Sequence, residues 1–462
     1  MKIGIFSKPH FLSRAILVFA LVACFIYGYI AYFTIRTEFF KFILLSGIAF
    51  ITTYVLIEKS QLKFNQLFLL AIFYRLIFLL SLPNLSQDFF RFFWDGQLVL
   101  QGINPYLETV NYYFSQNLDY KIQQADILRK GMGDLNASHY SNYPPMSQFI
   151  YAISAWFAND SIYGFIIAIR LILISFDLLF VLFAKKILAF FNKDPKALFW
   201  YILNPLCIIE ITGNLHLEGV MIALFVVAFF FMLRQRYIHS AFLFSLSITT
   251  KLMSLIFVPV LLKYFYKNNR FSLNFKTILN YGFWLVLFLF IQFALFYNST
   301  FYQNFSQTIS LWFGKFEFNA SIYYVVRWIG YKTIGWNIIQ TYSQIMPLFS
   351  ILCFIIILYK RKASPDQLLE SFMWMLTIYY LLSTTIHPWY ILFPLALSVF
   401  TRYNFVYLWS FLTLLSYYSY KISEVKESYW ILILEYGLII IYMFYELRKP
   451  LNKHPKHNRF IT

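Results

Sequence analysis

The chain has 462 residues, of which 60% are hydrophobic and only 13% are charged. A soluble domain carries about 25% charged residues, so this composition excludes a set of soluble domains. The apolar residues form blocks of about 20, the length of a membrane-spanning helix, and the alternating segments of an outer-membrane barrel are absent. The net charge is +18, but the basic residues do not gather on a polar helix with interleaved aromatics, which disfavours nucleic-acid binding. We interpret the excess of basic residues in the loops as a signal of membrane topology. We expect an all-α, polytopic integral membrane protein.

In chain order, the first apolar block follows basic residues, as in a signal peptide, but it is long and lacks a cleavage site. We therefore expect an uncleaved first helix. The apolar blocks predict about twelve spans, near residues 11–35, 39–57, 64–82, 162–184, 197–213, 217–234, 277–298, 337–358, 367–386, 388–400, 404–420 and 429–447. Two further pieces, 145–157 and 320–330, are too short to cross. The segment 240–262 contains Lys251 and Pro259, and we interpret it as a hairpin that enters the membrane and returns.

The loops between these spans differ in charge. Basic residues outnumber acidic ones in one alternating set of loops, and the two balance in the other set. The positive-inside rule then places both termini in the cytoplasm, with 448–462 as a basic tail, and 83–161 as the first extracytoplasmic loop. No repeat or linker divides the chain, so we expect one transmembrane domain over 1–462. All of the polar clusters described below fall on the outer side.

The first outer loop begins with a helical pattern in which Asp88, Arg91 and Asp95 share one face. The remaining positions are largely aromatic, which predicts a helix in the membrane interface with its aromatic side chains in lipid and its charges toward water. Arg91 could serve solubility alone. Alternatively, Asp88 is a general base that a flanking arginine keeps ionised. Further along, Tyr143 precedes two prolines that suit a helix start.

A second cluster follows the kink expected at Asn204-Pro205. Glu210, Asn214, His216 and Glu218 lie within nine positions between two predicted spans, and ionisable residues at membrane depth are functional candidates. A metal site and a site for a polyhydroxy ligand both fit this composition. The spacing matches no helical metal-binding motif, so we favour the polyhydroxy ligand. We predict no cofactor, and a divalent metal stays an open alternative.

Lys251 stands alone in the apolar segment 240–262 and needs an anion. That anion is either an internal carboxylate, such as Asp177 or Glu210, or a ligand phosphate. Arg170 and Asp177 share one helix face and could form a structural ion pair.

Two short motifs complete the set of polar clusters. Asn319 begins a short helix that ends near Arg327, and His387 precedes Trp389 at a helix junction. The indole ring is either an interfacial aromatic or a surface on which a sugar stacks.

Taken in order, these motifs resemble the GT-C superfamily of membrane glycosyltransferases, and most closely the bacterial mannosyltransferase-like members that use polyprenyl-phosphate sugars. The resemblance spans about residues 80–400. It rests on Asp88-x-x-Arg91-x-x-Trp94-Asp95-Gly96, Gly102-x-Asn104-Pro105-Tyr106, Tyr143-Pro144-Pro145, Asn204-Pro205-Leu206, Gly213-Asn214-x-His216, Thr250-Lys251, Phe318-Asn319-Ala320-Ser321 and His387-Pro388-Trp389-Tyr390. Phe92 stands where the family commonly has tyrosine, and Glu218 where it commonly has aspartate.

The resemblance implies a large helical fold with Asp88 as the catalytic carboxylate and a lipid-held donor, mannose favoured, in the outer leaflet. No nucleotide sugar is implied. The acceptor would be a glycan, lipid or protein of the cell envelope. We assign the donor phosphate to Arg91, Lys251, His387 and Arg327. We assign the sugar and acceptor to Asp95, Tyr143, Glu210, Asn214, His216, Glu218, Asn319 and Trp389. The alternatives are a transporter or flippase and a ligase of lipid-linked saccharides.

Overall fold

We analysed a computed structural model, which describes residues 8–116, 121–265, 275–361, 364–421 and 425–449. The predicted tail 448–462 lies outside the described residues beyond Lys449. Within the described ranges every regular element is helical, and the only β contact is an isolated parallel bridge between Phe318 and Thr385. The all-α prediction is therefore confirmed.

The helices divide into three consecutive stretches of chain, in which η marks a short 3₁₀ or π helix. The first stretch holds α1 (Lys8–Phe33), α2 (Phe39–Tyr54), η1 (Val55–Lys59), α3 (Phe64–Ile77), α4 (Asp88–Leu100), α5 (Val110–Gln116), α6 (Ala125–Ala137) and α7 (Pro145–Phe157). The second holds α8 (Ile162–Phe190), η2 (Pro195–Leu198), α9 (Phe199–Ile202), α10 (Pro205–Cys207), η3 (Ile208–Gly213), α11 (Glu218–Leu233), α12 (Tyr237–Thr250), η4 (Leu252–Phe257), α13 (Val258–Tyr264) and α14 (Phe275–Ala294). The third holds α15 (Phe301–Gly314), α16 (Ile322–Thr333), α17 (Ile339–Lys360), α18 (Pro365–Leu382), η5 (Pro388–Ile391), α19 (Leu392–Ser398), α20 (Phe405–Leu412), η6 (Thr413–Tyr420) and α21 (Tyr429–Arg448).

Six helical segments in the described ranges are long and apolar enough to cross a membrane: Ile16–Phe33, Phe39–Lys59, Ile162–Phe190, Phe275–Ala294, Ile339–Lys360 and Tyr429–Arg448. A seventh is added if the bent pair Pro205–Gly213 and Glu218–Leu233 counts as one span. The expected number of about twelve is therefore not confirmed. Several apolar blocks are broken into short helices: the segment predicted at 388–400 starts at Pro388 as one 3₁₀ turn and then forms the seven-residue α19. Hydropathy reports apolar content, whereas a span also needs an unbroken helix.

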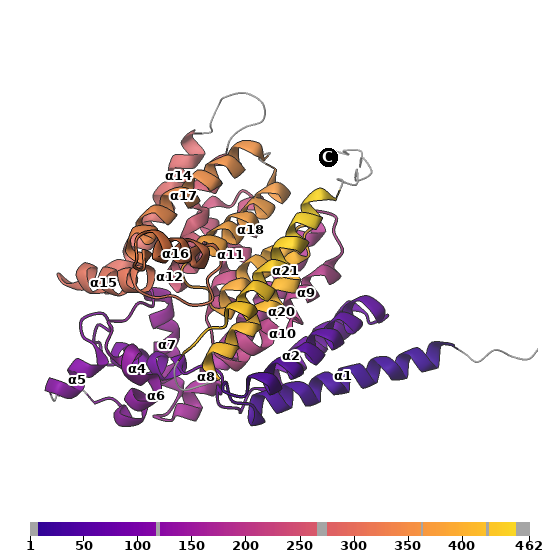
Figure 1. The fold of residues 1–462 in the computed structure, drawn as a ribbon, viewed down its shortest axis with the longest axis horizontal. Helices are drawn as coiled ribbons and strands as arrows, with labels where there is room; N and C mark the ends of the chain where they lie inside the picture. Colours follow the sequence, from indigo (N-terminus) through magenta and orange to yellow (C-terminus); the bar gives the residue numbers. More distant parts are fainter. Residues whose placement is uncertain (1–7, 117–120, 266–274, 362–363, 422–424, 450–462) are drawn as a thin grey trace, which may run out of the picture.

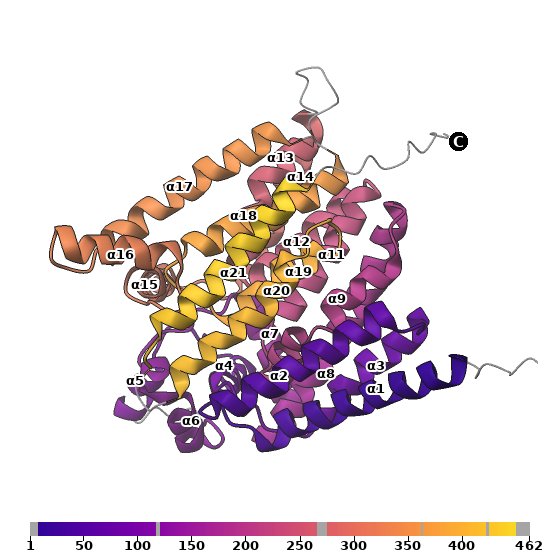
Figure 2. The ribbon, with the colours of Figure 1, turned by 45° about the vertical axis from the view of Figure 1, so that its right-hand side comes forward.

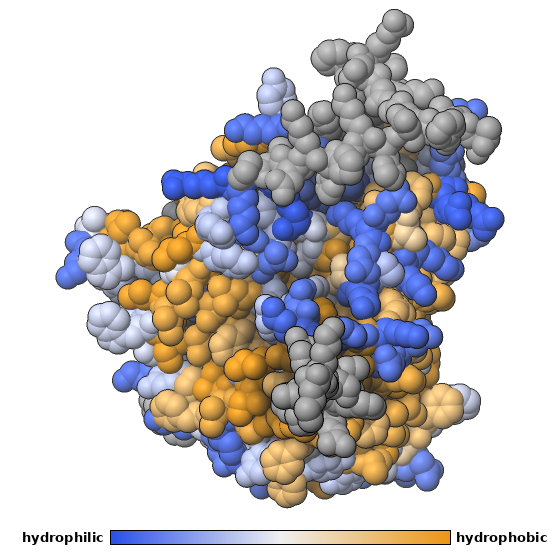
Figure 3. Space-filling model, turned by 90° about the vertical axis from the view of Figure 1, so that its right-hand side faces the viewer, coloured by the Kyte–Doolittle hydropathy of each residue, from blue (hydrophilic) through white to orange (hydrophobic). Residues whose placement is uncertain are grey.

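The helices form a bundle, and three helices of the first stretch lie together at one end of it. Figures 1 and 2 both show α4, α5 and α6 gathered at that end, while α1, α2, α20 and α21 lie roughly side by side. On the face drawn in Figure 3, hydrophobic residues cover a broad continuous area, and hydrophilic residues gather mainly toward the upper part. An apolar surface of this extent belongs in lipid, which agrees with a membrane protein.

The helix predicted after Asp88 forms as α4, but its environment differs from the expectation. Phe89, Phe92, Phe93 and Trp94 are all buried within the protein. Phe92 stacks on Tyr151 with ring centroids 4.5 Å apart. The prediction of aromatic side chains in lipid is wrong for these residues, because α6, α7 and α8 cover the helix.

The backbones of α4 and α7 approach closely at Gly96. A Cβ atom on this residue would lie 2.4 Å from the carbonyl oxygen of Tyr151. Only glycine permits this approach, which fixes α4 against α7.

Arg170 on α8 ties two breaks in the chain together. Its fully buried guanidinium donates to the carbonyls of Phe78, Leu79 and Ser81, which follow α3, and to those of Thr212 and Gly213 at the end of η3. Backbone outside regular helix needs hydrogen-bond donors from the protein at membrane depth. The five N–H groups of one arginine supply that need.

Asp177 does not pair with Arg170. It accepts from Nε of Arg75, at 2.6 Å, and both side chains are buried. The predicted pair of Arg170 and Asp177 is therefore wrong, because each charged group has a nearer partner on a different element.

We expect Arg170→Lys to destabilise the protein by at least about 2 kcal/mol, because a lysine cannot reach five carbonyls and buried acceptors lose charged hydrogen bonds. The free energy of unfolding in detergent measures the effect. Arg129→Lys is the control, since Arg129 is 30% exposed and its partner Asp134 is 92% exposed. Equal stability of the two variants would contradict the role given to Arg170.

Candidate functional site

The site is built on a broken span. Asn204 caps α10 by accepting from the N–H of Leu206 at 2.9 Å, and Pro205 occupies the first helical position. The chain then forms the π helix η3, and the axis bends by 112° before α11 begins. Leu215 in the bend has a left-handed φ of 67°. π turns and left-handed residues are frequent at functional sites, and this bend collects four polar side chains at one end of the span.

Within the bend, Glu210, Asn214 and His216 contact one another. Asn214 donates to Glu210 Oε2 at 2.8 Å, and Nδ1 of His216 lies 3.2 Å from the same oxygen. The hydroxyl of Tyr417 on η6 donates to Glu210 Oε1 at 2.8 Å. The carboxylate of Glu210 therefore holds the amide and the imidazole in fixed positions.

The other ring nitrogen of His216 faces Asp88. Nε2 lies 3.7 Å from Asp88 Oδ2, and the Asp88 side chain is 30% exposed whereas His216 is 1% exposed. Asp88 is the first residue of α4, where the helix dipole favours a negative charge. The contacts from Glu210 through His216 to Asp88 thus lead from a buried carboxylate to an accessible one.

Asp88 is held in its ionised form. Burial by itself would raise the pKa of this carboxyl, but the interaction with His216, supported by the charge of Lys251, lowers it below the ordinary value of 3.8. The side chain is therefore a carboxylate throughout the physiological pH range.

An aromatic wall borders His216. The rings of His216 and Trp389 are 3.9 Å apart, and His387 stacks on Trp389 at 4.4 Å with an interplanar angle of 6°. Phe318 covers the His387 ring at 4.9 Å. Burial, opposed by the charge of Asp88, lowers the pKa of His387 to about 3. His387 is thus neutral at physiological pH and can act on a ligand as a hydrogen-bonding group only.

Lys251 forms an ion pair that the sequence did not predict. Its ammonium contacts the carboxylate of Glu218, and the side chains are 24% and 3% exposed, respectively. The partner is thus neither Asp177 nor Glu210. The second oxygen of Glu218 is buried without a hydrogen-bond partner among the described residues. Lys251 sits at the break between α12 and η4, in extended backbone, where its side chain can reach both Glu218 and incoming anions.

Tyr143 lies just before α7, near the charged groups of the site. It is half-buried, its ring meets Phe92 edge-on at 5.1 Å, and Tyr106 donates to its carbonyl at 2.6 Å. Burial first, and then the charges of Asp88, Asp95 and Glu218, raise the pKa of its phenol well above the ordinary value. The neutral hydroxyl is available to hydrogen-bond near Asp88.

Arg91 and Asp95 form a buried ion pair inside the protein. Arg91 Nε donates to Asp95 Oδ1 at 2.7 Å, and its Nη1 donates to the carbonyls of Asn136 and His139. Ser141 and Gln148 donate to the other Asp95 oxygen at 2.5 and 3.1 Å. Arg91 and Asp95 are only 2% and 0% exposed. Their charges are used within the protein, behind the surface that carries Asp88.

Asn319 and Arg327 lie in a separate cluster. The N–H of Asn319 donates to Glu427 at 2.5 Å, and its side-chain amide donates to Glu435 at 3.3 Å. Arg327 pairs with Glu317 and lies over the ring of Tyr324. The backbone beside Asn319 nevertheless serves the site, because the N–H of Ile386 donates to the carbonyl of Phe318 and so holds Phe318 against His387.

The sequence did not predict three residues of this arrangement. Tyr417 positions Glu210, while Ser141 and Gln148 satisfy Asp95. Ser141 and Gln148 flank the Tyr143-Pro144-Pro145 motif, a usable signal. Tyr417 is about 200 positions from Glu210, in an aromatic apolar block that gives no local sign of a polar contact.

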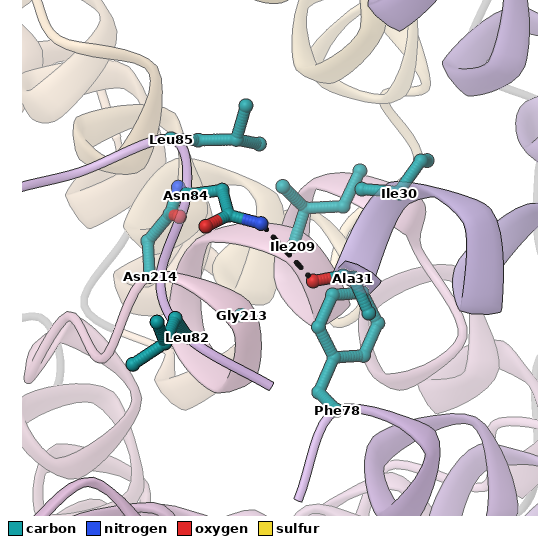
Figure 4. Close-up of a pocket in the computed structure, with 9 residues that line it drawn as sticks. All are labelled: Ile30, Ala31, Phe78, Leu82, Asn84, Leu85, Ile209, Gly213 and Asn214. Carbon is teal, nitrogen blue, oxygen red and sulfur yellow. Dashed lines mark hydrogen bonds between the residues drawn. The ribbon is translucent and has the colours of Figure 1, made fainter. Parts of the chain in front are cut away.

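A small pocket lies behind the bend, between α1, the segment after α3, and η3 (Figure 4). Its lining includes Asn214, Gly213 and Phe78, and Asn84 donates to the carbonyl of Ala31 at 3.4 Å. Asn214 therefore contributes to both the pocket and the Glu210 group.

The described residues contain no group of three or more His, Cys, Asp and Glu side chains arranged to hold a metal ion. The expectation of a site without metal or cofactor stays a prediction.

Comparison with known proteins identifies the family. The profile of the α-(1→6)-mannopyranosyltransferase N-terminal domain matches residues 18–267, which is just over half of the chain and includes Asp88, the η3 bend and Lys251. Curated proteins give no match to this chain. The family match confirms the resemblance to mannosyltransferases that the motifs predicted. The chain belongs to the α-(1→6)-mannopyranosyltransferase family and is a membrane glycosyltransferase.

Proposed function

We propose that this protein transfers mannose from a polyprenyl-phosphate donor to a hydroxyl of a glycan acceptor at the outer face of the cytoplasmic membrane. The observation that carries the proposal is Asp88: an ionised, 30% exposed carboxylate beside a lysine and an aromatic wall. A base must be ionised and accessible to accept the proton of an alcohol. These are the groups that a sugar phosphate and its acceptor need within one site.

The proposed reaction is a single displacement. Asp88 accepts the proton of the acceptor hydroxyl while its oxygen bonds to the anomeric carbon of mannose. The bond from that carbon to the phosphate oxygen breaks, and polyprenyl phosphate leaves with the bonding electrons. Attack opposite the leaving group inverts the anomeric centre, by the geometry that governs inverting glycosidases.

Lys251 is the cation we assign to the donor phosphate. It is 24% exposed, and its charge acts on Asp88. Arrival of a phosphate would draw Lys251 from Glu218 and free a buried carboxylate to accept hydrogen bonds from sugar hydroxyls. Preorganised charge of this kind stabilises the developing negative charge of the leaving phosphate.

Arg91 and Arg327 take other roles in this proposal. Arg91 is only 2% exposed and pairs with Asp95, and Arg327 pairs with Glu317 in the separate cluster. We therefore assign Arg91 and Asp95 to the support of α4. Trp389 is the surface on which a sugar ring would stack, and His387 and Tyr143 would donate to its hydroxyls.

The charges at the two ends of α11 support the proposed orientation. Glu218 at its first residue belongs to the site, and Arg234 and Arg236 follow its last residue. Under the positive-inside rule the arginines lie in the cytoplasm, and the site then lies outside, where lipid-held donors and not nucleotide sugars would be used.

The first prediction concerns the base and the donor together. Purified protein in vesicles is expected to transfer labelled mannose from polyprenyl-phosphate mannose. Asp88→Asn is expected to lower kcat by about 10²–10⁴-fold, the usual contribution of a general base. The KM for the donor should change little, because Lys251 and Trp389 remain.

Asp134→Asn is the matched control, since Asp134 lies in the same outer loop and is 92% exposed. Its rate should equal that of the unmodified protein. Full activity of Asp88→Asn would remove the proposed base. Transfer from GDP-mannose and not from the lipid-linked donor would reject the donor class.

The second prediction concerns pH. The rate falls as pH drops through the pKa of Asp88, which lies below 3.8. His216→Gln removes the main interaction that lowers this pKa and leaves the burial that raises it. The acidic limb of the kcat/KM profile should therefore move to higher pH.

His139→Gln is the control for the pH profile, because His139 lies beside Trp312 and outside the Asp88 group. A His216→Gln profile that coincides with that of the unmodified protein would show that His216 does not set the ionisation of Asp88.

The third prediction concerns topology. In a cysteine-free background, Ser138→Cys and Gln235→Cys place thiols at two exposed positions. A membrane-impermeant maleimide should label the first in intact cells, and the second only after permeabilisation. The opposite pattern would place the site in the cytoplasm.

A further inference from the structure

The far end of α11 carries a cluster of cations and aromatic rings that the transfer reaction does not use. Phe230, Phe231, Arg234 and Arg236 line a pocket that opens to solvent. Phe183 of α8 packs on Phe230 with ring centroids 5.1 Å apart. We call these five residues, together with Lys186, the basic aromatic pocket.

Two cations of this pocket, Lys186 and Arg234, lie on the rings instead of on carboxylates. Nζ of Lys186 is 4.7 Å from the centroid of Phe183 and 5.5 Å from that of Phe230, and the guanidinium of Arg234 is 5.7 Å from the latter. None of the ion pairs among the described residues involves Lys186, Arg234 or Arg236. All three side chains are exposed. The pocket therefore presents positive charge without a resident anion.

The backbone fixes the two arginines in place. The N–H of Arg236 donates to the carbonyl of Phe231, and the N–H of Gln235 donates to that of Met232. Gln235 has a left-handed φ of 57°. These features are those of a Schellman motif, which normally uses glycine at the left-handed position. A glutamine there is a strained choice, and it sets Arg234 and Arg236 on either side of a rigid turn.

The position of the pocket indicates the kind of anion. The 16 residues of α11 separate it from Glu218 at the catalytic end, a distance of about 24 Å along the helix. That separation covers most of the roughly 30 Å of the hydrocarbon core of a bilayer. A crossing of the membrane by α11 would place the half-buried rings of Phe230 and Phe231 at the acyl-chain boundary and the cations just beyond it, at headgroup level.

We propose that the basic aromatic pocket binds one anionic phospholipid, with its phosphate between Arg234, Arg236 and Lys186 and its acyl chains against Phe230 and Phe231. Basic pockets between membrane helices favour anionic headgroups for this reason. The inference does not depend on the proposed sugar transfer, because it concerns the opposite end of α11.

The test titrates delipidated full-length protein in detergent with phosphatidylglycerol or with phosphatidylcholine of the same acyl chains, and counts bound lipid by native mass spectrometry. One phosphatidylglycerol is expected to bind, in preference to phosphatidylcholine. The double variant Arg234→Gln with Arg236→Gln should weaken that binding by about tenfold or more. Both residues are exposed, so the fold should be kept, and thermal unfolding verifies it.

The control variant is Lys59→Gln with Lys63→Gln, which removes the same charge from two exposed positions in the connection between α2 and α3. It should bind phosphatidylglycerol as the unmodified protein does. An equal loss in both variants would show general surface electrostatics, and displacement of the lipid by excess inorganic phosphate would show a site for a free anion. Either result, or equal binding of the two lipids, would overturn the proposal.

Discussion

The structure depends on one buried arginine that replaces missing backbone hydrogen bonds. A chain that leaves helical geometry at membrane depth exposes carbonyl groups to a medium without water. Arg170 takes the carbonyls after α3 and those at the end of η3 onto a single guanidinium. The first break leads to Asp88 and the second to His216. Because one side chain from α8 binds both breaks, two segments more than a hundred positions apart are held together, and Asp88 and His216 face each other.

The exposure of the two members of each ion pair distinguishes structural pairs from charges that a substrate can reach. Arg75 with Asp177 and Arg91 with Asp95 are pairs in which both members are buried, and burial of both makes them parts of the frame. Asp88 and Lys251 differ, because each is partly exposed while its partner is buried. A charge that the protein supports from behind and leaves open in front can act on a substrate. This asymmetry supports the proposed roles of Asp88 and Lys251, although Arg91 stands closer to Asp88 in the sequence.

The sequence predicted the members of the site better than their contacts. The spacing of Asp88, Arg91 and Asp95 predicted α4, and the motifs around His216 and Trp389 named two residues whose rings are 3.9 Å apart. It did not predict that α4 would be covered by protein, because periodicity marks an apolar face without saying what covers it. Nor did it identify Glu218 as the partner of Lys251. Such pairs form across 33 positions through the packing of α11 and α12. The predicted number of about twelve spans is not confirmed, because apolar blocks that the structure breaks into short helices look continuous to a hydropathy window.

The bend at η3 interrupts a span and places its polar residues inside the protein. In an unbroken helix Glu210 and Glu218 would lie just over two turns apart on nearly the same face. A carboxylate cannot be accepted where such a face meets lipid. Breaking the helix by 112° turns its polar segment inward, where Tyr417, Asn214 and Lys251 are available as partners. The unbroken remainder, α11, is nearly all buried and apolar, so it carries no chemistry of its own along its length. Its contribution is distance, because its 16 residues separate Glu218 from Arg234 and Arg236 by about 24 Å along the helix.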